Sequence, residues 1–351
     1  MIKTNILNKK NSQFILLGLG SVGKRHADFL SSFSNNLICV DPKNEARKWA
    51  GQNLKGNFEV FDSLKNVSKS ILVKTPKIGV VANLGPTHFE SICDLIKIGV
   101  KALYIEKPIS NSLKSLDEIL KLCKKNSIKL LGGFQHRYAG IFEKVLEISK
   151  KKLGGLPTLM CVNGGAMGIV TNGIHYLDLA VSIFQSHPTY VISDLRNMKI
   201  NPRSKALDFW EGSATWGFKN NKQLSINTSN FSSVRQRAEI FCPYGKISIN
   251  EDLSLSVFIR DKNEILSDSR MVRLGTAKKK DKPAIKPKLE NLYKKIFSFL
   301  IEGNYSMRSL ERELIATRAM IFALIANKES KKIFLSKVIN KKWYGHQWPI
   351  S

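Results

Sequence analysis

The amino-acid sequence predicts two domains: an α/β domain with a doubly wound parallel sheet, then an α+β domain with an open, mainly antiparallel sheet. A length of 351 residues is long for one hydrophobic core. Up to residue 134, buried-strand patterns alternate with helical patterns, as in parallel sheets. Beyond it, short segments alternate apolar and polar residues with period two, as in antiparallel strands. We therefore expect one domain at 1–134 and a second at 135–351.

The first buried strand, Phe14–Leu17, leads into a glycine loop and then a helical pattern. This context and the spacing G-x-G-x-x-G are typical of a dinucleotide-binding turn. The first glycine permits a tight turn, the second lets the backbone approach a pyrophosphate, and the third lets the helix pack on its strand. The helix N-terminus attracts a diphosphate. The alternative is an ordinary strand–helix turn. The expected cofactor-binding residues of this loop are Gly18, Gly20, Ser21, Val22 and Gly23.

The second strand, Leu37–Val40, ends in Asp41, about 20 residues beyond the glycines, where a carboxylate can accept hydrogen bonds from ribose hydroxyls. A carboxylate would repel a 2′-phosphate, so we expect NAD as the cofactor, with NADP less favoured. The alternative is that Asp41 is only a turn residue before Pro42.

Two later strands, at 77–82 and 102–105, end in polar residues. Ligands of parallel sheets bind at the carboxyl ends of strands. We therefore expect further cofactor contacts from Asn83, His88, Glu106 and Lys107.

The second half is expected to form the antiparallel sheet from segments within 158–259, with a helix from about residue 173 to Phe184. The basic stretch 278–282 is interpreted as a solvated loop, and two helices are expected at 289–302 and 309–327.

The formal net charge of +28 raises the question of a nucleic-acid partner. Most basic residues are lysines, and no stripe of arginines interleaved with aromatics is present. We therefore expect no nucleic-acid partner, although a positive field would attract an anionic substrate. Five cysteines without a C-x-x-C pair, a polar N-terminus and no long apolar run predict a cytoplasmic protein without membrane or metal sites.

Four motifs occur in order: the glycine loop, Glu106-Lys107-Pro108, Gly133–Tyr138, and Gly173-Ile-His-Tyr-Leu-Asp178. Together they resemble the glucose–fructose oxidoreductase and inositol dehydrogenase family (Gfo/Idh/MocA). The resemblance implies that 1–134 is an NAD(P)-binding Rossmann domain and that 135–351 is a substrate-binding and oligomerisation domain with an open sheet. It implies NAD(P)-dependent oxidation or reduction of a hydroxyl or ketone on a sugar, sugar acid or sugar nucleotide. It also implies a homodimer or homotetramer. An open sheet face would be a large apolar patch, which favours self-association.

Lys107 and His175 are the expected catalytic residues. A lysine after a buried strand can stabilise negative charge on the reacting oxygen, and a histidine titrates near neutrality. The alternatives are a surface lysine and a satisfied buried histidine. Asp178 is expected either to orient the His175 ring or to be a plain helix acid.

The family commonly has an aspartate four residues before the histidine, where this sequence has Thr171. This departure favours either proton transfer by His175 and Lys107 alone or altered substrate contacts. A rival interpretation is a non-catalytic relative that binds a dinucleotide and a sugar for regulation. The expected substrate-binding residues are Arg137, Tyr138, Thr171, Asn172 and His175, with interdomain packing as the alternative for the first two.

Overall fold

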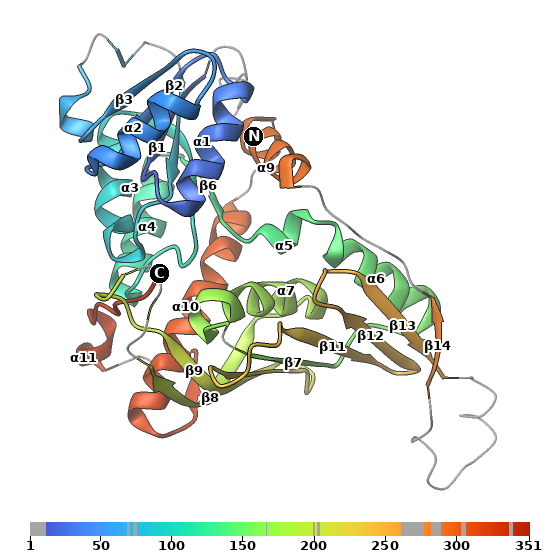
Figure 1. Ribbon diagram of the computed structural model, residues 1–351. Helices are drawn as coiled ribbons and strands as arrows, with labels where there is room; N and C mark the ends of the chain where they lie inside the picture. Colours follow the sequence, from blue (N-terminus) through green and yellow to red (C-terminus); the bar gives the residue numbers. More distant parts are fainter. Residues whose placement is uncertain are drawn as a thin grey trace, which may run out of the picture. The chain divides into compact units, whose positions relative to one another are not determined.

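The structure, a computed structural model, describes residues 12–68, 71–72, 76–165, 167–198, 201, 204–260, 277–281, 289–302, 307–336 and 340–351. These residues form two compact units (Figure 1). The first comprises the described parts of Met1–Gly133, Leu289–Leu314 and Lys341–Ser351. The second comprises those of Phe134–Lys288 and Ile315–Asn340.

In the first unit, the described residues form a parallel sheet of six strands in the order β3-β2-β1-β4-β5-β6. The direction of strand order reverses between β1 and β4, which places the ligand crevice of such a sheet at their carboxyl ends. The expected doubly wound parallel sheet is confirmed. Its elements are β1 (Gln13–Leu17), α1 (Ser21–Phe33), β2 (Leu37–Val40), α2 (Asn44–Asn53), β3 (Phe58–Phe61), η1 (Leu64–Asn66), β4 (Lys77–Val81), η2 (Gly85–Thr87), α3 (His88–Lys97), β5 (Val100–Ile105), α4 (Leu113–Lys125) and β6 (Lys129–Gly132).

Two C-terminal segments complete the core of the first unit. The ring of Phe297, in α9 (Leu289–Glu302), packs edge-on against Phe14 of β1 at 5.9 Å between centroids. In the other segment, Trp343 of α11 (Lys341–Tyr344) stacks on Trp348 at 5.7 Å. The first unit therefore differs from the continuous range 1–134 expected from the sequence, because strand and helix patterns do not show which sheet a distant helix covers.

The described residues of the second unit form a nine-stranded sheet in the order β14-β13-β12-β11-β7-β10-β9-β8-β15. All neighbouring pairs are antiparallel except β7 and β10, so the expected mainly antiparallel sheet is confirmed. Its elements are α5 (Gln135–Tyr138), α6 (Ile141–Lys152), β7 (Leu159–Gly165), a π-helical turn η3 (Ile169–Gly173), α7 (Ile174–Phe184), β8 (Pro188–Asn197), β9 (Trp210–Phe218), β10 (Gln223–Ser229), β11 (Arg237–Cys242), β12 (Gly245–Ile249), β13 (Leu255–Ile259), β14 (Lys278–Asp281), the part of α10 (Met307–Glu329) from Ile315 onward, and β15 (Ile333–Phe334).

The C-terminal part of α10 covers one face of this sheet. The indole N–H of Trp216 donates to the carbonyl of Ala319 at 3.1 Å, and the Ser193 hydroxyl donates to that of Ala323 at 2.6 Å. Polar side chains lie on the opposite face, where Asn227 Nδ2 donates to Asn163 Oδ1 at 2.9 Å. This part of the open face is not the apolar patch expected from the sequence, so self-association stays a prediction without that support.

The expectation of a solvated loop at 278–282 was wrong for residues 278–281. They form β14, which pairs antiparallel with β13 through Ile259 opposite Lys278. Backbone groups make the ladder, so a lysine-rich segment can pair, and charged residues are common on edge strands. Lys282 and the polar N-terminal residues 1–11 lie outside the described residues.

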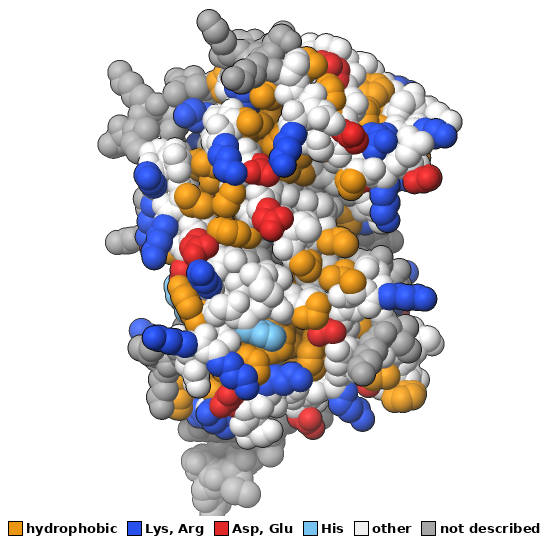
Figure 2. Space-filling view, turned by 90° about the vertical axis from the view of Figure 1, so that its left-hand side faces the viewer, with side chains coloured by type: hydrophobic (Ala, Val, Ile, Leu, Met, Phe, Trp, Pro, Cys, Tyr) orange, Lys and Arg blue, Asp and Glu red, His pale blue; other side chains and the backbone are white. Residues whose placement is uncertain are grey.

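Figure 2 shows lysine and arginine side chains spread over the visible face among acidic and apolar ones. All five cysteines are free thiols. Burial raises the pKa of Cys39 and Cys123 to about 12, so both stay protonated. No helix among the described residues is long and apolar enough to span a membrane.

Candidate functional site

The glycine loop after β1 is shaped by two close backbone contacts. Gly18 has φ +96°, and a Cβ there would lie 2.6 Å from the backbone N of Asn83. A Cβ on Gly23 would lie 2.0 Å from the carbonyl oxygen of Gly18. Gly20 is exposed, and a Cβ there would meet no atom within 4 Å. Gly18 and Gly23 are thus required by packing, whereas Gly20 leaves open space beside the loop.

That open space lies at the N-terminus of α1. Gly20 is the N-cap residue, no side chain caps the helix, and its first turn contains no acidic residue. Ser21 is exposed and Val22 is partly exposed. The unpaired N–H groups of such a first turn bind anions. The loop therefore fits the diphosphate of a dinucleotide.

Asp41 ties the glycine loop to the end of β2. Its Oδ2 accepts from the backbone N–H of Leu19 at 2.7 Å, and its Oδ1 accepts from that of Lys43 at 2.8 Å. The residue is buried. A carboxylate oxygen has a second lone pair, so these bonds leave acceptor capacity for ribose hydroxyls. Asp41 is more than a turn residue before Pro42, and its position fits the role expected from the sequence.

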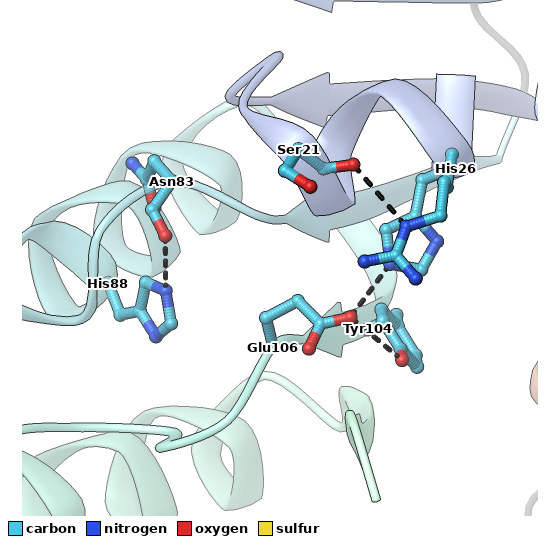
Figure 3. A network of polar contacts seen from close by, with 7 residues as sticks. Ser21, His26, Asn83, His88, Tyr104 and Glu106 are labelled. Carbon is cyan, nitrogen blue, oxygen red and sulfur yellow. Dashed lines mark hydrogen bonds and ion pairs between the residues drawn. The ribbon is translucent and has the colours of Figure 1, made fainter. Parts of the chain in front are cut away.

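His88 connects the loop after β4 with the segment after β5, and its contact with Asn83 is drawn in Figure 3. Asn83 Nδ2 donates to Ser91 Oγ at 2.7 Å, while its Oδ1 is buried without a hydrogen-bond partner among the described residues. The His88 ring contacts the carbonyl oxygens of Pro108, at 2.9 Å, and of Asn83, at 3.1 Å. Burial lowers the pKa of His88. Asn83 thus has a free acceptor for a ligand, whereas His88 joins two loops.

Glu106 points into a buried network instead of presenting both of its oxygens to the crevice. Its Oε1 lies 2.8 Å from His26 Nε2 and accepts from the Tyr104 hydroxyl at 3.2 Å (Figure 3). Burial alone would raise the pKa of Glu106. The hydrogen bond and charge of His26, with the charge of Lys107 and the Tyr104 hydroxyl, outweigh it and hold the pKa below its ordinary value.

Lys107 directly follows β5 and is only 7% exposed, so it is not the surface lysine considered as an alternative. The peptide bond to Pro108 is cis. Lysine is rarely buried to this degree without a specific environment. Its charge, next to the Glu106 carboxylate, is part of the polar end of β5.

In the second unit, Arg137 of α5 and Asp178 of α7 form a buried bidentate pair. Arg137 Nε donates to Asp178 Oδ2 at 3.1 Å, and Nη2 donates to Oδ1 at 2.5 Å. The Asp178 side chain is 1% exposed. Neither role considered for Asp178 included this pairing. The guanidinium of Arg137, expected to bind substrate, is paired within the protein.

His175 lies on α7 between buried neighbours but is itself partly exposed, as are Thr171 and Asn172. Its ring lies 5.1 Å from that of His136 and edge-on to Phe134 at 6.4 Å. Asn172 Nδ2 donates to the carbonyl of Met167 at 2.5 Å. The second unit thus brings His175 together with the turn that carries the residues expected to contact substrate; Tyr138, on α5, is partly exposed.

Sequence reasoning missed the partners of these residues, chiefly His26, Tyr104 and His136. One signal was present: His26 falls on the apolar side of a helical pattern and Glu106 at the end of a buried strand. Two titratable groups at buried positions usually pair. No group of three His, Cys, Asp or Glu in the described part of the chain is placed to hold a metal.

These features define a Rossmann-type NAD-binding domain joined to a second domain with a mainly antiparallel sheet. Residues 13–134 match the Gfo/Idh/MocA model, which is described as "Oxidoreductase family, NAD-binding Rossmann fold". The resemblance seen in the motifs is confirmed, as are the expected cofactor, NAD, and the enzyme class, an NAD-dependent oxidoreductase.

Three relatives illustrate the similarity. The myo-inositol 2-dehydrogenase of Thermotoga maritima is 23% identical over 265 residues, which cover 70% of this chain and 77% of that protein. An oxidoreductase from Agrobacterium radiobacter, solved with NAD+, L-tartaric acid and magnesium, superposes with a TM-score of 0.71 at 14% identity, covering 93% and 99% of the two chains. The UDP-N-acetylglucosamine 3-dehydrogenase of Acidithiobacillus ferrooxidans superposes with a TM-score of 0.69 at 16% identity. The match covers 90% of this chain and 98% of that chain.

Proposed function

We propose that this chain oxidises a hydroxyl group, or reduces the corresponding ketone, on a sugar, sugar acid or sugar nucleotide with NAD as the redox partner. The observation that carries the proposal is the glycine loop with its open space at Gly20 and the Asp41 carboxylate beside it, within a domain of an NAD-binding oxidoreductase family. The substrate class is supported by relatives named for inositol and a sugar nucleotide.

The proposed roles follow from residue chemistry. NAD, when bound, supplies the hydride acceptor or donor. Lys107, buried at the end of β5, stabilises negative charge on the reacting oxygen. His175, partly exposed on α7, takes or returns the hydroxyl proton. Thr171 contributes at most a hydrogen bond, because it lacks the carboxylate common at this position of the family.

The test is a panel of polyols, sugar acids and sugar nucleotides, followed by NADH absorbance. On the substrate so found, Lys107→Ala or His175→Ala should lower turnover by roughly 100-fold or more, the usual contribution of a positioned acid–base group. Thr171→Ala is the matched control and should lower turnover far less. Wild-type turnover in both variants would contradict the site.

Asp41 should make the chain bind NAD more tightly than NADP, because a 2′-phosphate would face its carboxylate. Titration calorimetry with each cofactor measures the difference, which Asp41→Ala should narrow. Equal or tighter binding of NADP by the unaltered chain would contradict this assignment.

Thr171 also favours a second candidate function, a regulatory protein that binds dinucleotide and sugar without turnover. The same panel separates the two functions. Binding of NAD and a sugar, with no NADH formed from any compound, would favour the regulatory function.

A further inference from the structure

The stretch 348–351 is largely buried on the first unit, whereas most of residues 341–347 are exposed. Trp348 is 2% exposed, Ile350 is 0% and Ser351 is 7%. Irregular backbone buried to this degree needs hydrogen-bond partners. Those partners show which part of the unit the segment is fitted to.

The partners lie in two of the loops that follow strands of the parallel sheet. The backbone N–H of Trp348 donates to the carbonyl of Asn111 at 2.9 Å, in the buried stretch after Lys107. The backbone N–H of Gly85 donates to Ser351 Oγ at 3.3 Å, in the loop after β4. The segment therefore contacts both loops that His88 joins.

The closest approach is at Gly85. A Cβ there would lie 2.3 Å from the carbonyl oxygen of Ile350 and 3.2 Å from Ser351 Cα. Gly85 does not have a positive φ, so its backbone conformation would accept alanine. Close contact with Ile350 is what requires glycine at this position.

The contact continues towards the glycine loop. Gly85 lies two residues beyond Asn83, whose backbone N would be 2.6 Å from a Cβ on Gly18. Asn83 also has the buried Oδ1 without a partner among the described residues. A displacement of Gly85 would therefore be passed to Asn83, which contacts the glycine loop at Gly18.

We propose that Pro349–Ser351 is a positioning element for NAD binding, which holds the loop Asn83–His88 in its binding conformation before the cofactor arrives. The proposal rests on the assignment of Asn83 and the glycine loop to the NAD site. A loop ordered in advance spares the entropy that binding would otherwise have to overcome. Pro349–Ser351 thus raises NAD affinity without any of its residues having to touch NAD.

The first test is Gly85→Ala in the full chain, with the dissociation constant for NAD measured by titration calorimetry. The added methyl should displace Ile350 and weaken binding by about tenfold, which corresponds to about 1.4 kcal/mol. The matched control is Gly51→Ala in α2, where a Cβ would meet no atom within 4 Å and affinity should be unchanged. Wild-type affinity in Gly85→Ala would overturn the proposal.

The decisive step repeats Gly85→Ala in a variant that lacks residues 349–351. Removal of these residues should itself weaken NAD binding by about tenfold, and Gly85→Ala should then add nothing, because its obstacle is gone. The same loss from Gly85→Ala with and without residues 349–351 would overturn the proposal, because the substitution would then act without them.

Ser351→Ala covers the case in which the shortened variant does not fold. It removes one acceptor and should weaken NAD binding roughly threefold, with Ser351→Thr restoring the affinity and with the melting temperature unchanged. Wild-type affinity in Ser351→Ala would count against the proposal. A failure of the unaltered chain to bind NAD at all would contradict the proposed function itself, and this inference with it.

Discussion

The candidate sites of the two units are held together by different kinds of contact. Around the glycine loop of the first unit, backbone lies against backbone, as between Gly18 and Asn83, or is held by one carboxylate, as between Leu19 and Asp41. In the second, side chains pair with side chains, as in Arg137 with Asp178 and His136 with His175. A site formed by close backbone contacts tolerates few substitutions, because any added side chain meets backbone atoms. A site formed by side chains can be altered by substituting one residue at a time. Thr171, in the second unit, is such a change.

The largest expected effect concerns the buried pair of the second unit. Arg137→Met would leave the Asp178 carboxylate, whose side chain is 1% exposed, without its cation. The free energy of unfolding should fall by about 3–5 kcal/mol, measured by urea titration. Lys144→Met, which breaks the exposed pair with Glu147, is the control and should cost less than about 1 kcal/mol. A similar loss of unfolding free energy in the two variants would contradict the distinction between the buried and the exposed ion pair.

The second prediction compares two glycines of one loop. Gly23→Ala should lower the free energy of unfolding by about 2–3 kcal/mol, because its Cβ would lie 2.0 Å from the Gly18 carbonyl oxygen. Gly20→Ala should leave stability within about 0.5 kcal/mol, because its Cβ meets nothing.

The NAD affinity of Gly20→Ala should nevertheless fall by about tenfold, because the methyl would occupy the space of the diphosphate. Chemical denaturation and calorimetry measure the two quantities on the same samples. Unchanged NAD affinity in Gly20→Ala would show that the open space is not the diphosphate site.

The smallest expected effect is a pH dependence in the second unit. Burial lowers the pKa of His136 to about 4, although the charge of Asp178 acts in the opposite direction. The folded-state pKa thus lies below the unfolded value of about 6.5. The stability that the neutral His136 contributes to the folded state is fully present above about pH 6.5. It is lost as the pH falls from about 6.5 to 4.

Because His136 is partly exposed, the loss should be about 1–2 kcal/mol. His136→Asn should reduce the pH dependence of the free energy of unfolding across this range. His346→Asn, at an exposed histidine, should leave that pH dependence unchanged. An unaltered slope in His136→Asn would mean that another group titrates there.

The sequence predicted best where a single residue type has a single physical cause. Three glycines after a buried strand and an aspartate about 20 residues later located the nucleotide loop, because only glycine fits Gly18 and Gly23. The alternation of strands and helices likewise predicted the parallel sheet. Both are local patterns, which neighbouring residues along the chain determine.

The sequence predicted least where the cause lies far along the chain. The contact of Glu106 with His26 was not predicted, and Asp178 was considered a partner of His175, but it pairs with Arg137. Residues 278–281 were expected to be a loop because their side chains are charged, although the partner strand β13 decides their conformation. Periodicity contains no information about such partners.

The first unit is completed by residues that the ribosome makes long after its parallel sheet. Phe297 packs against Phe14 and Phe33, at 5.9 and 6.4 Å between centroids, but it is synthesised long after both. At about 5–20 residues per second, the delay between Gly133 and Phe297 is roughly ten to thirty seconds. During that time the emerging nucleotide domain presents an uncovered aromatic surface to chaperones. A fragment ending at residue 134 would keep that surface exposed permanently and should aggregate.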